Sequence, residues 1–141
     1  MSMNDPYELQ RFVDAQHAVF QAVCGELRQG RKRGHWMWFI FPQIRGLGSS
    51  YMADRYAISS LEEAKAYMGH QVLGARLREC TRLVTLVEGH SIREIFGRPD
   101  DLKFRSSMTL FAHATSENEI FHDALRKYCG GTFDPLTLER L

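Results

Sequence analysis

The residues best suited to ligand chemistry fall in two stretches of the chain, residues 31–50 and residues 100–109. The first stretch holds both tryptophans, directly after a run of three basic residues and directly before a Gly-Leu-Gly-Ser-Ser loop. Large aromatics, cations and glycine-rich backbone are components of ligand pockets. In such a pocket Trp36 or Trp38 could stack on a flat group, and Gln43 could bind a polar ligand through its amide.

The second stretch places two cations and several hydroxyls close together: Lys103, Arg105, Ser106, Ser107 and Thr109. On a helix, Lys103 shares a face with Ser107, and Arg105 shares another with Thr109, because each pair is spaced i,i+4. An arginine fork, a lysine ammonium and hydroxyl donors together suit a phosphate or a carboxylate. The alternative is a solvated helix face on which Asp101 pairs with Arg105.

His35 is the one acid–base candidate near these groups, between the basic run and Trp36. An imidazole with an ordinary pKa of about 6.5 can serve as a general base or bind a ligand, and the alternative is a histidine bonded to backbone. The sequence has no phosphate-binding glycine loop, no nucleophile elbow and no metal-ligand spacing of His or Cys. It therefore predicts no metal and no cofactor, and it identifies no reaction.

The charge and hydropathy of the chain restrict its partners. Lys and Arg number 18 against 17 Asp and Glu, so the strongly basic face of most nucleic-acid-binding proteins is not indicated. The basic run Arg31, Lys32 and Arg33 also has a structural explanation, because cations stabilise the C-terminal end of a helix. The longest apolar run, residues 36–42, is too short to span a bilayer, and no export signal is visible. We therefore expect a cytoplasmic protein without membrane association.

Three cysteines, Cys24, Cys80 and Cys129, lie far apart in the sequence within apolar, periodic segments. Such positions are typical of buried, reduced thiols, which also suit the cytosol. We expect all three to react slowly with thiol reagents in the native protein.

The elements that must position the candidate residues are predicted to be helices. Asp5-Pro6 is typical of a helix start, with Asp as N-cap and Pro at the first helical position. Ser-x-x-Glu capping boxes begin at Ser60, Ser91 and Ser116. Together with the apolar periodicity, these signals predict long helices over residues 6–29, 61–68, 71–88, 100–114 and 117–128. Short helices are expected after Ser49 or Ser50, after Ser91 and after Asp134.

The fold class that follows is all-α, a compact multihelical single domain over residues 1–141. Pro42 excludes a continuous helix through residues 31–50. The aromatic segment at about residues 35–42 is therefore a short strand, a 3₁₀ turn or irregular chain, and its periodicity does not decide among these. If it is extended, Trp36 and Trp38 lie on the same side of it.

Several strings of residues resemble a known family. They are His35-Trp-Met-Trp-Phe-Ile-Phe-Pro-Gln43, Gly46-Leu-Gly48, Tyr56-Ala-Ile58, Glu94-Ile-Phe-Gly97, Pro99-Asp-Asp-Leu-Lys103 and Ser106-Ser-Met-Thr-Leu-Phe111. They are similar to the family catalogued as domain of unknown function 1810, from about Tyr7 to Leu141. Gly34 and Phe104 depart from the family pattern, which has Ser and Leu at these positions.

The resemblance implies a compact, multihelical, bacterial-type cytosolic protein. It implies no established reaction, so no catalytic residue is carried over to this chain. Members of the family sometimes carry a calpastatin-like label, but calpastatin is a disordered inhibitor, and this chain has the composition of a packed domain.

Two hypotheses of function follow. In the first, the protein binds an anionic, nucleotide-like or phosphorylated small molecule between residues 35–48 and a helix containing residues 103–109, with or without catalysis. In the second, the aromatic and basic residues 31–50 dock a protein partner and the domain has no catalytic activity, since Trp and Arg are common interface anchors. A concave pocket holding His35, Trp36 and Arg105 would favour the first hypothesis, and a flat exposed patch the second. Nucleic acid is the least favoured partner.

Overall fold

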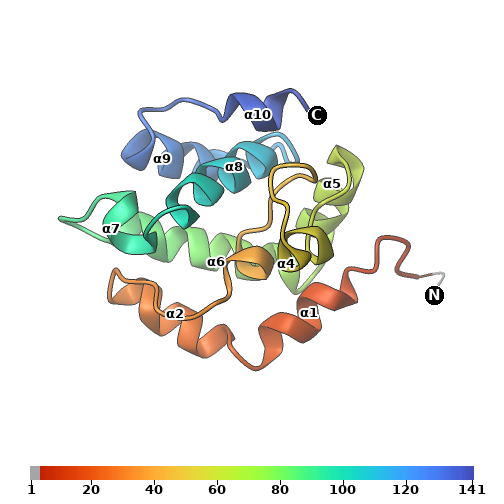
Figure 1. The fold of residues 1–141 in the computed structure, drawn as a ribbon, viewed down its shortest axis with the longest axis horizontal. Helices are drawn as coiled ribbons and strands as arrows, with labels where there is room; N and C mark the ends of the chain where they lie inside the picture. Colours follow the sequence, from red (N-terminus) through yellow and green to blue (C-terminus); the bar gives the residue numbers. More distant parts are fainter. Residues whose placement is uncertain (1–3) are drawn as a thin grey trace.

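Helices α6 and α8 form the centre of the computed structural model, which describes residues 4–141 (Figure 1). α6 packs against α2, α5 and α9, whereas α8 packs against α5, α7, α9 and α10. In chain order the helices are α1 (Gln10–His17), α2 (Phe20–Arg28), α3 (Met37–Ile40), α4 (Tyr51–Arg55), α5 (Leu61–Gly69), α6 (Leu73–Leu86), α7 (Ile92–Phe96), α8 (Asp100–Ala112), α9 (Glu119–Tyr128) and α10 (Pro135–Leu138).

The all-α prediction is confirmed, since residues 4–141 contain these helices and no strand. The one extended pairing in this part of the chain is an isolated parallel bridge between Ile44 and Ile58. The aromatic segment, whose conformation the sequence left open, forms the single-turn helix α3. Within residues 4–141, no helix is both long enough and apolar enough to cross a membrane.

α8 is buried on almost every side. Its apolar residues Phe104, Met108, Leu110 and Phe111 are fully buried. Its small hydroxyl residues Ser107 and Thr109 are also fully buried, and Ser106 is 7% exposed. Small side chains let neighbouring elements approach closely, and two of these hydroxyls bond to carbonyls one turn back along the helix. The alternative of a solvated face is therefore wrong for this part of α8.

The predicted first helix, residues 6–29, is wrong in two respects. It begins at Gln10 rather than Pro6, because the Asp5 carboxylate accepts hydrogen bonds from Leu9 N at 2.7 Å and Gln10 N at 3.0 Å. It also breaks between His17 and Phe20, into α1 and α2. The break lets α1 pack against α3 while α2 packs against α6, which one straight helix could not do (Figure 1).

The predicted caps had mixed outcomes. Ser50 and Asp134 cap α4 and α10 through their side chains, and Ser91 forms the complete capping box with Glu94. Ser60 caps α5, but Glu63 does not complete its box, because that carboxylate binds Ser59 and Arg11 instead. These bonds tie the start of α5 to α1.

The capping box predicted at Ser116 is wrong. α9 begins at Glu119, with Asn118 as its N-cap residue and no side-chain cap. The Asn118 side chain instead donates to the carbonyl of Ala112, which ends α8. A contact between two helices has here replaced a local signal.

All three cysteines are free thiols, and Cys24 and Cys80 are buried as predicted. Cys129 is only partly buried. Cys24 of α2 and Cys80 of α6 share a hydrogen bond, which lowers the pKa of the Cys24 thiol to about 7 and raises that of Cys80. The slow reaction of the three thiols stays a prediction.

Candidate functional site

A cavity of about 340 Å³ lies between α8, α10 and the chain that follows α3. We refer to it as the α8 pocket. The residues that line it are Gln43, Leu47, Pro99, Leu102, Lys103, Arg105, Ser106, Asp134 and Leu136. Four residues that the sequence singled out therefore meet around one hollow, although Gln43 is far from the other three in the chain.

Lys103 lines the α8 pocket, and its ammonium group makes one long ion pair. Its Nζ lies 3.6 Å from Asp100 Oδ1 and 5.3 Å from the centre of the Trp38 ring. An ammonium has three N–H donors, so at least one remains for a ligand. The lysine is available to an anion without first losing a tight ion pair.

Trp38 lies beside the α8 pocket, at a small void of about 10 Å³ that Gln43 and Lys103 also line. Its indole Nε1 is buried and has no hydrogen-bond partner within residues 4–141. A void of this size holds at most about one water molecule. Gln43 and Lys103 thus line both the α8 pocket and the void beside Trp38.

Arg105 has a structural role as well as a place in the lining. Its Nε donates to Thr132 O at 3.2 Å, and its Nη2 donates to Thr132 Oγ1 at 2.8 Å and Phe133 O at 2.6 Å. These bonds hold the α9–α10 connection against α8. The predicted alternative partner, Asp101, pairs instead with Arg98 at 3.1 Å.

Asp134 is a lining residue that the sequence revealed only as a helix cap. Its Oδ2 lies 2.8 Å from Ser106 Oγ and accepts from Thr137 Oγ1 at 2.6 Å, and its backbone N–H donates to Thr109 Oγ1. α10 is therefore docked on the buried hydroxyls of α8. This docking forms one wall of the α8 pocket and explains why those hydroxyls are on α8.

Three predicted site residues lie elsewhere. His35 is exposed and does not line the α8 pocket. Ser107 is fully buried, and its hydroxyl has no partner among the described residues. Trp36 is 3% exposed, packs on Phe41 and Phe96, and is part of the core.

The indole of Trp36 is fixed by Glu26. Glu26 Oε1 accepts from Trp36 Nε1 at 3.0 Å, Arg33 N at 2.6 Å and Gly34 N at 2.9 Å. Burial would raise the pKa of Glu26, but these hydrogen bonds outweigh it and hold the pKa below its ordinary value. Trp36 therefore anchors the loop before α3 and is not available for stacking on a ligand.

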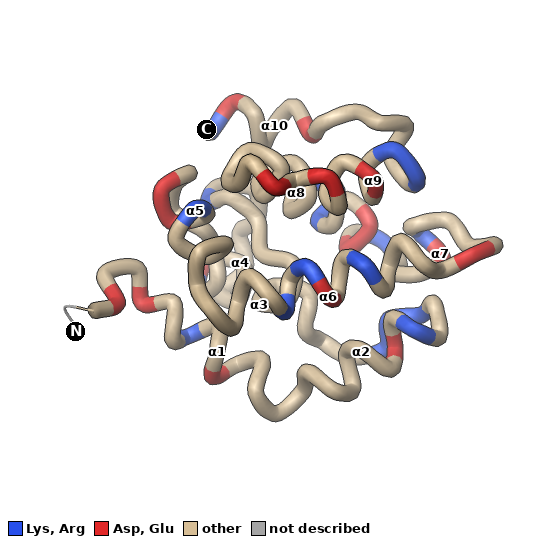
Figure 2. Tube along the Cα trace, turned by 180° about the vertical axis from the view of Figure 1, so that it is seen from behind, with Lys and Arg blue, Asp and Glu red and all other residues tan. Residues whose placement is uncertain are grey.

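The basic run at residues 31–33 contains one lysine in an ion pair and two exposed arginines. Lys32 Nζ binds Asp100 Oδ2 at 3.0 Å, whereas Arg31 and Arg33 are exposed. Elsewhere Lys and Arg are interspersed with Asp and Glu on the face shown in Figure 2. Across residues 4–141, no group of three or more His, Cys, Asp or Glu side chains is placed to hold a metal ion.

Comparisons with known proteins place this geometry in a family. The model of the family described as "Protein of unknown function (DUF1810)" matches residues 6–141. The crystal structure of the conserved hypothetical protein Rv1873 from Mycobacterium tuberculosis is 63% identical, with a TM-score of 0.95 over 96% of each chain. No curated protein matches the chain. With a family match over nearly its whole length and a solved relative of the same fold, the chain belongs to the DUF1810 family.

Proposed function

We propose that the protein binds, in the α8 pocket, a small organic molecule with one anionic group and an apolar part. The observation that carries this proposal is the convergence of Gln43, Lys103, Arg105 and Ser106 on one cavity. Gln43 comes from the chain after α3, whereas the other three side chains are on α8. The amide and the two cations suit an oxyanion, and the Ser106 hydroxyl already binds within the fold.

The charges around the α8 pocket favour an anion. Two cations, Lys103 and Arg105, line it against one carboxylate, Asp134, whose Oδ2 is already bound to Ser106 and Thr137. Arg105 Nη1 has no partner within the described chain, so part of the guanidinium remains for a ligand. A carboxylate or phosphate oxygen would gain charge-assisted hydrogen bonds from these groups.

The size and apolar lining of the α8 pocket narrow the ligand further. Leu47, Pro99, Leu102 and Leu136 form its apolar part, and Leu102 and Leu136 are 51% and 56% exposed. Ligand pockets span about 300–1,000 Å³, so 340 Å³ suits a compact molecule rather than a dinucleotide. Because Trp36 is buried and Lys103 lies over Trp38, aromatic stacking of a nucleobase has little support.

The alternative, docking of a protein partner through residues 31–50, has weaker support. Its strongest anchor would have been an exposed tryptophan. Trp36 is in the core and Trp38 is partly buried under Lys103.

Thermal melts test the proposal. The probes are benzoate, indole-3-acetate, AMP, glucose 6-phosphate and inorganic phosphate, each added to wild type, Lys103→Met and Lys65→Met. Lys65 is exposed and lines neither part of the site, so its variant is the matched control for loss of one cation. A ligand that binds only the native state raises the melting temperature.

We expect at least one organic anion to raise the melting temperature of wild type and Lys65→Met but not that of Lys103→Met. Absence of any rise in wild type would refute the proposal. An equal rise in Lys103→Met would place the binding elsewhere.

A further inference from the structure

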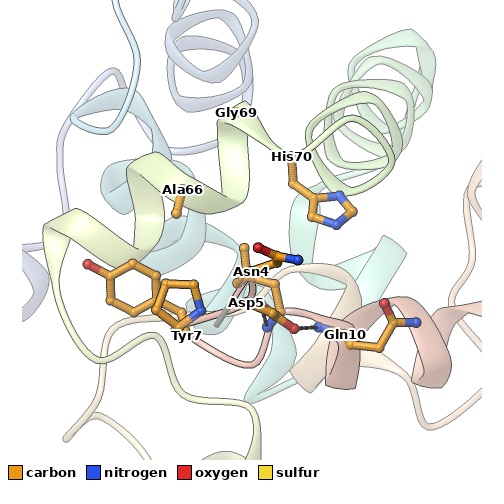
Figure 3. A pocket seen from close by; sticks show the side chains of 9 residues that line it. Asn4, Asp5, Tyr7, Gln10, Ala66, Gly69 and His70 are labelled. Carbon is orange, nitrogen blue, oxygen red and sulfur yellow. Dashed lines mark hydrogen bonds between the residues drawn. The ribbon is translucent and has the colours of Figure 1, made fainter. Parts of the chain in front are cut away.

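A second cavity, of about 560 Å³, lies on another part of the molecule, between the N-terminal segment and the end of α5 (Figure 3). We refer to it as the N-terminal pocket. It shares no residue with the α8 pocket, and its lining is Asn4, Asp5, Pro6, Tyr7, Leu9, Gln10, Ala66, Gly69 and His70. Nothing in the proposed function uses these residues.

His70 gives the N-terminal pocket a defined hydrogen-bond donor. Its Nδ1 accepts from the backbone N–H groups of Val72 at 3.1 Å and Leu73 at 3.3 Å, at the start of α6. A ring nitrogen that accepts hydrogen bonds carries no proton, so the neutral imidazole carries its proton on Nε2. That Nε2 has no partner in the described part of the chain, and His70 lines the cavity.

Gln10 gives the same pocket an acceptor. Its Nε2 donates to Asp14 Oδ1 at 2.9 Å, which directs one end of the amide along α1 and leaves Oε1 without a partner among residues 4–141. Figure 3 shows the imidazole of His70 and the side chain of Gln10 around the same hollow. A donor and an acceptor that line the same cavity match the oxygen and the N–H of a carboxamide, which are bonded to one carbon.

The charges of the N-terminal pocket exclude a charged ligand as its best occupant. Among the described residues, no Lys or Arg lines it. The one carboxylate among its described lining residues, Asp5, already accepts from Leu9 N and Gln10 N. Figure 3 marks the bond to Gln10 with a dashed line. An anion would lose its hydration without gaining a counter-ion, and a cation would meet only a carboxylate that caps α1.

We propose that the N-terminal pocket is a second binding site, which takes an uncharged carboxamide attached to a flat apolar group. The amide oxygen accepts from His70 Nε2–H, and the amide N–H donates to Gln10 Oε1. The apolar group packs on Pro6, Leu9 and Ala66, which line the cavity. The proposal does not depend on the function of the α8 pocket.

The test uses benzamide as the probe, with benzoate and benzylamine as analogues of the same size and opposite charges. Nitrogen-15 NMR of the histidine rings in the wild-type protein is the first measurement. We expect benzamide to shift the His70 Nε2 resonance without shifting that of His35, which does not line this pocket. We expect both charged analogues to bind more weakly than benzamide.

The second measurement compares His70→Asn with His35→Asn. Asparagine can still accept from the N–H groups of Val72 and Leu73 through its oxygen, so the start of α6 is preserved. Loss of one neutral hydrogen bond should weaken benzamide binding about tenfold in His70→Asn and leave it unchanged in His35→Asn.

Three results would overturn this proposal. They are no shift of His70 with benzamide, equal binding of benzoate, or unchanged binding in a folded His70→Asn protein. The wild-type NMR result decides the question even if His70→Asn does not fold.

Discussion

The two tryptophans lie two residues apart, each under a lysine, but they differ in burial and in the partner of the indole N–H. Lys32 Nζ is 5.2 Å from the centre of the Trp36 ring, and Lys103 Nζ is 5.3 Å from that of Trp38. Both lysines interact with Asp100. The indole N–H of Trp36 is bonded to Glu26, whereas the indole N–H of Trp38 is buried without a partner among the described residues.

This comparison separates a structural tryptophan, whose N–H is paired, from one whose N–H is unpaired. On the Trp36 side, Glu26 Oε1 accepts from the indole N–H and from the backbone N–H groups of Arg33 and Gly34, and the ring is in the core. On the Trp38 side, a donor, an amide and an ammonium retain hydrogen-bonding capacity next to a cavity. Buried polar groups are normally paired, so the unpaired side is where a ligand has something to contribute.

The largest expected effect is on the Trp36 side. Trp36→Ala should lower the free energy of unfolding by about 3–5 kcal/mol, because it leaves a cavity and removes a partner of Glu26. Trp38→Ala should cost less than half as much, since Trp38 is only partly buried. Urea denaturation followed by far-UV circular dichroism measures both, and equal losses would erase the distinction between the two sides.

The next largest loss of stability is expected at Arg105, which lines the α8 pocket and also holds the α9–α10 connection. Arg105→Ala should lower the free energy of unfolding by about 1–2 kcal/mol, because the carbonyls of Thr132 and Phe133 lose their donor. Chemical denaturation without ligand checks this value. No loss of stability would mean that Arg105 serves only recognition, in conflict with its hydrogen bonds.

A smaller effect on the free energy of unfolding is expected at Glu26, and this effect should depend on pH. Because the pKa of Glu26 is held below its ordinary value, its contribution is present at neutral pH and is lost as pH falls below about 4.5. We expect Glu26→Gln to cost about 1 kcal/mol at pH 7. The difference from wild type should shrink in urea titrations at pH 3, whereas exposed Glu62→Gln should show little difference at either pH. A difference that grows on acidification would reverse the assigned direction of the shift.

The smallest effect compares the two lysines. Lys32→Met should lower the free energy of unfolding by about 1 kcal/mol. The reason is that Lys32 Nζ lies 3.0 Å from Asp100 Oδ2 and the lysine side chain is only 10% exposed. Lys103→Met should change stability by less than about 0.5 kcal/mol, given the 3.6 Å separation and greater exposure. If Lys103 proved the more important for stability, it would be a structural residue and a poor candidate for ligand binding.

Most of the fold could be predicted because its signals are local. The caps at Ser50, Ser91 and Asp134 and the acidic start of α8 involve residues within one turn of each other. Two of the errors came where a side chain near a predicted cap bound a partner in another helix. Glu63 binds Arg11 instead of completing its capping box, and Asn118 binds Ala112 O instead of leaving Ser116 to begin α9.

The polar residues of the candidate site could be proposed from the sequence, because long polar side chains usually reach solvent or a cavity. Lys103, Arg105 and Gln43 reach a cavity, as their polarity favours. Trp36 could not be distinguished from Trp38, because the choice depends on Glu26, which comes from α2. His70 and its fixed tautomer had no sequence signal, since its role depends on the turn between α5 and α6.

The docking of α10 has a practical consequence for work on this protein, because α10 lines one cavity and residues 4–7 line the other. Leu136 of α10 lines the α8 pocket, and Arg140 Nη2 donates to Gly46 O at 3.3 Å, next to the lining residue Leu47. Residues 4–7 line the N-terminal pocket. Removal of residues 134–141 would therefore remove one wall of the α8 pocket, and substitutions within residues 4–7 would alter the N-terminal pocket. Binding experiments call for protein that retains residues 4–7 and residues 134–141.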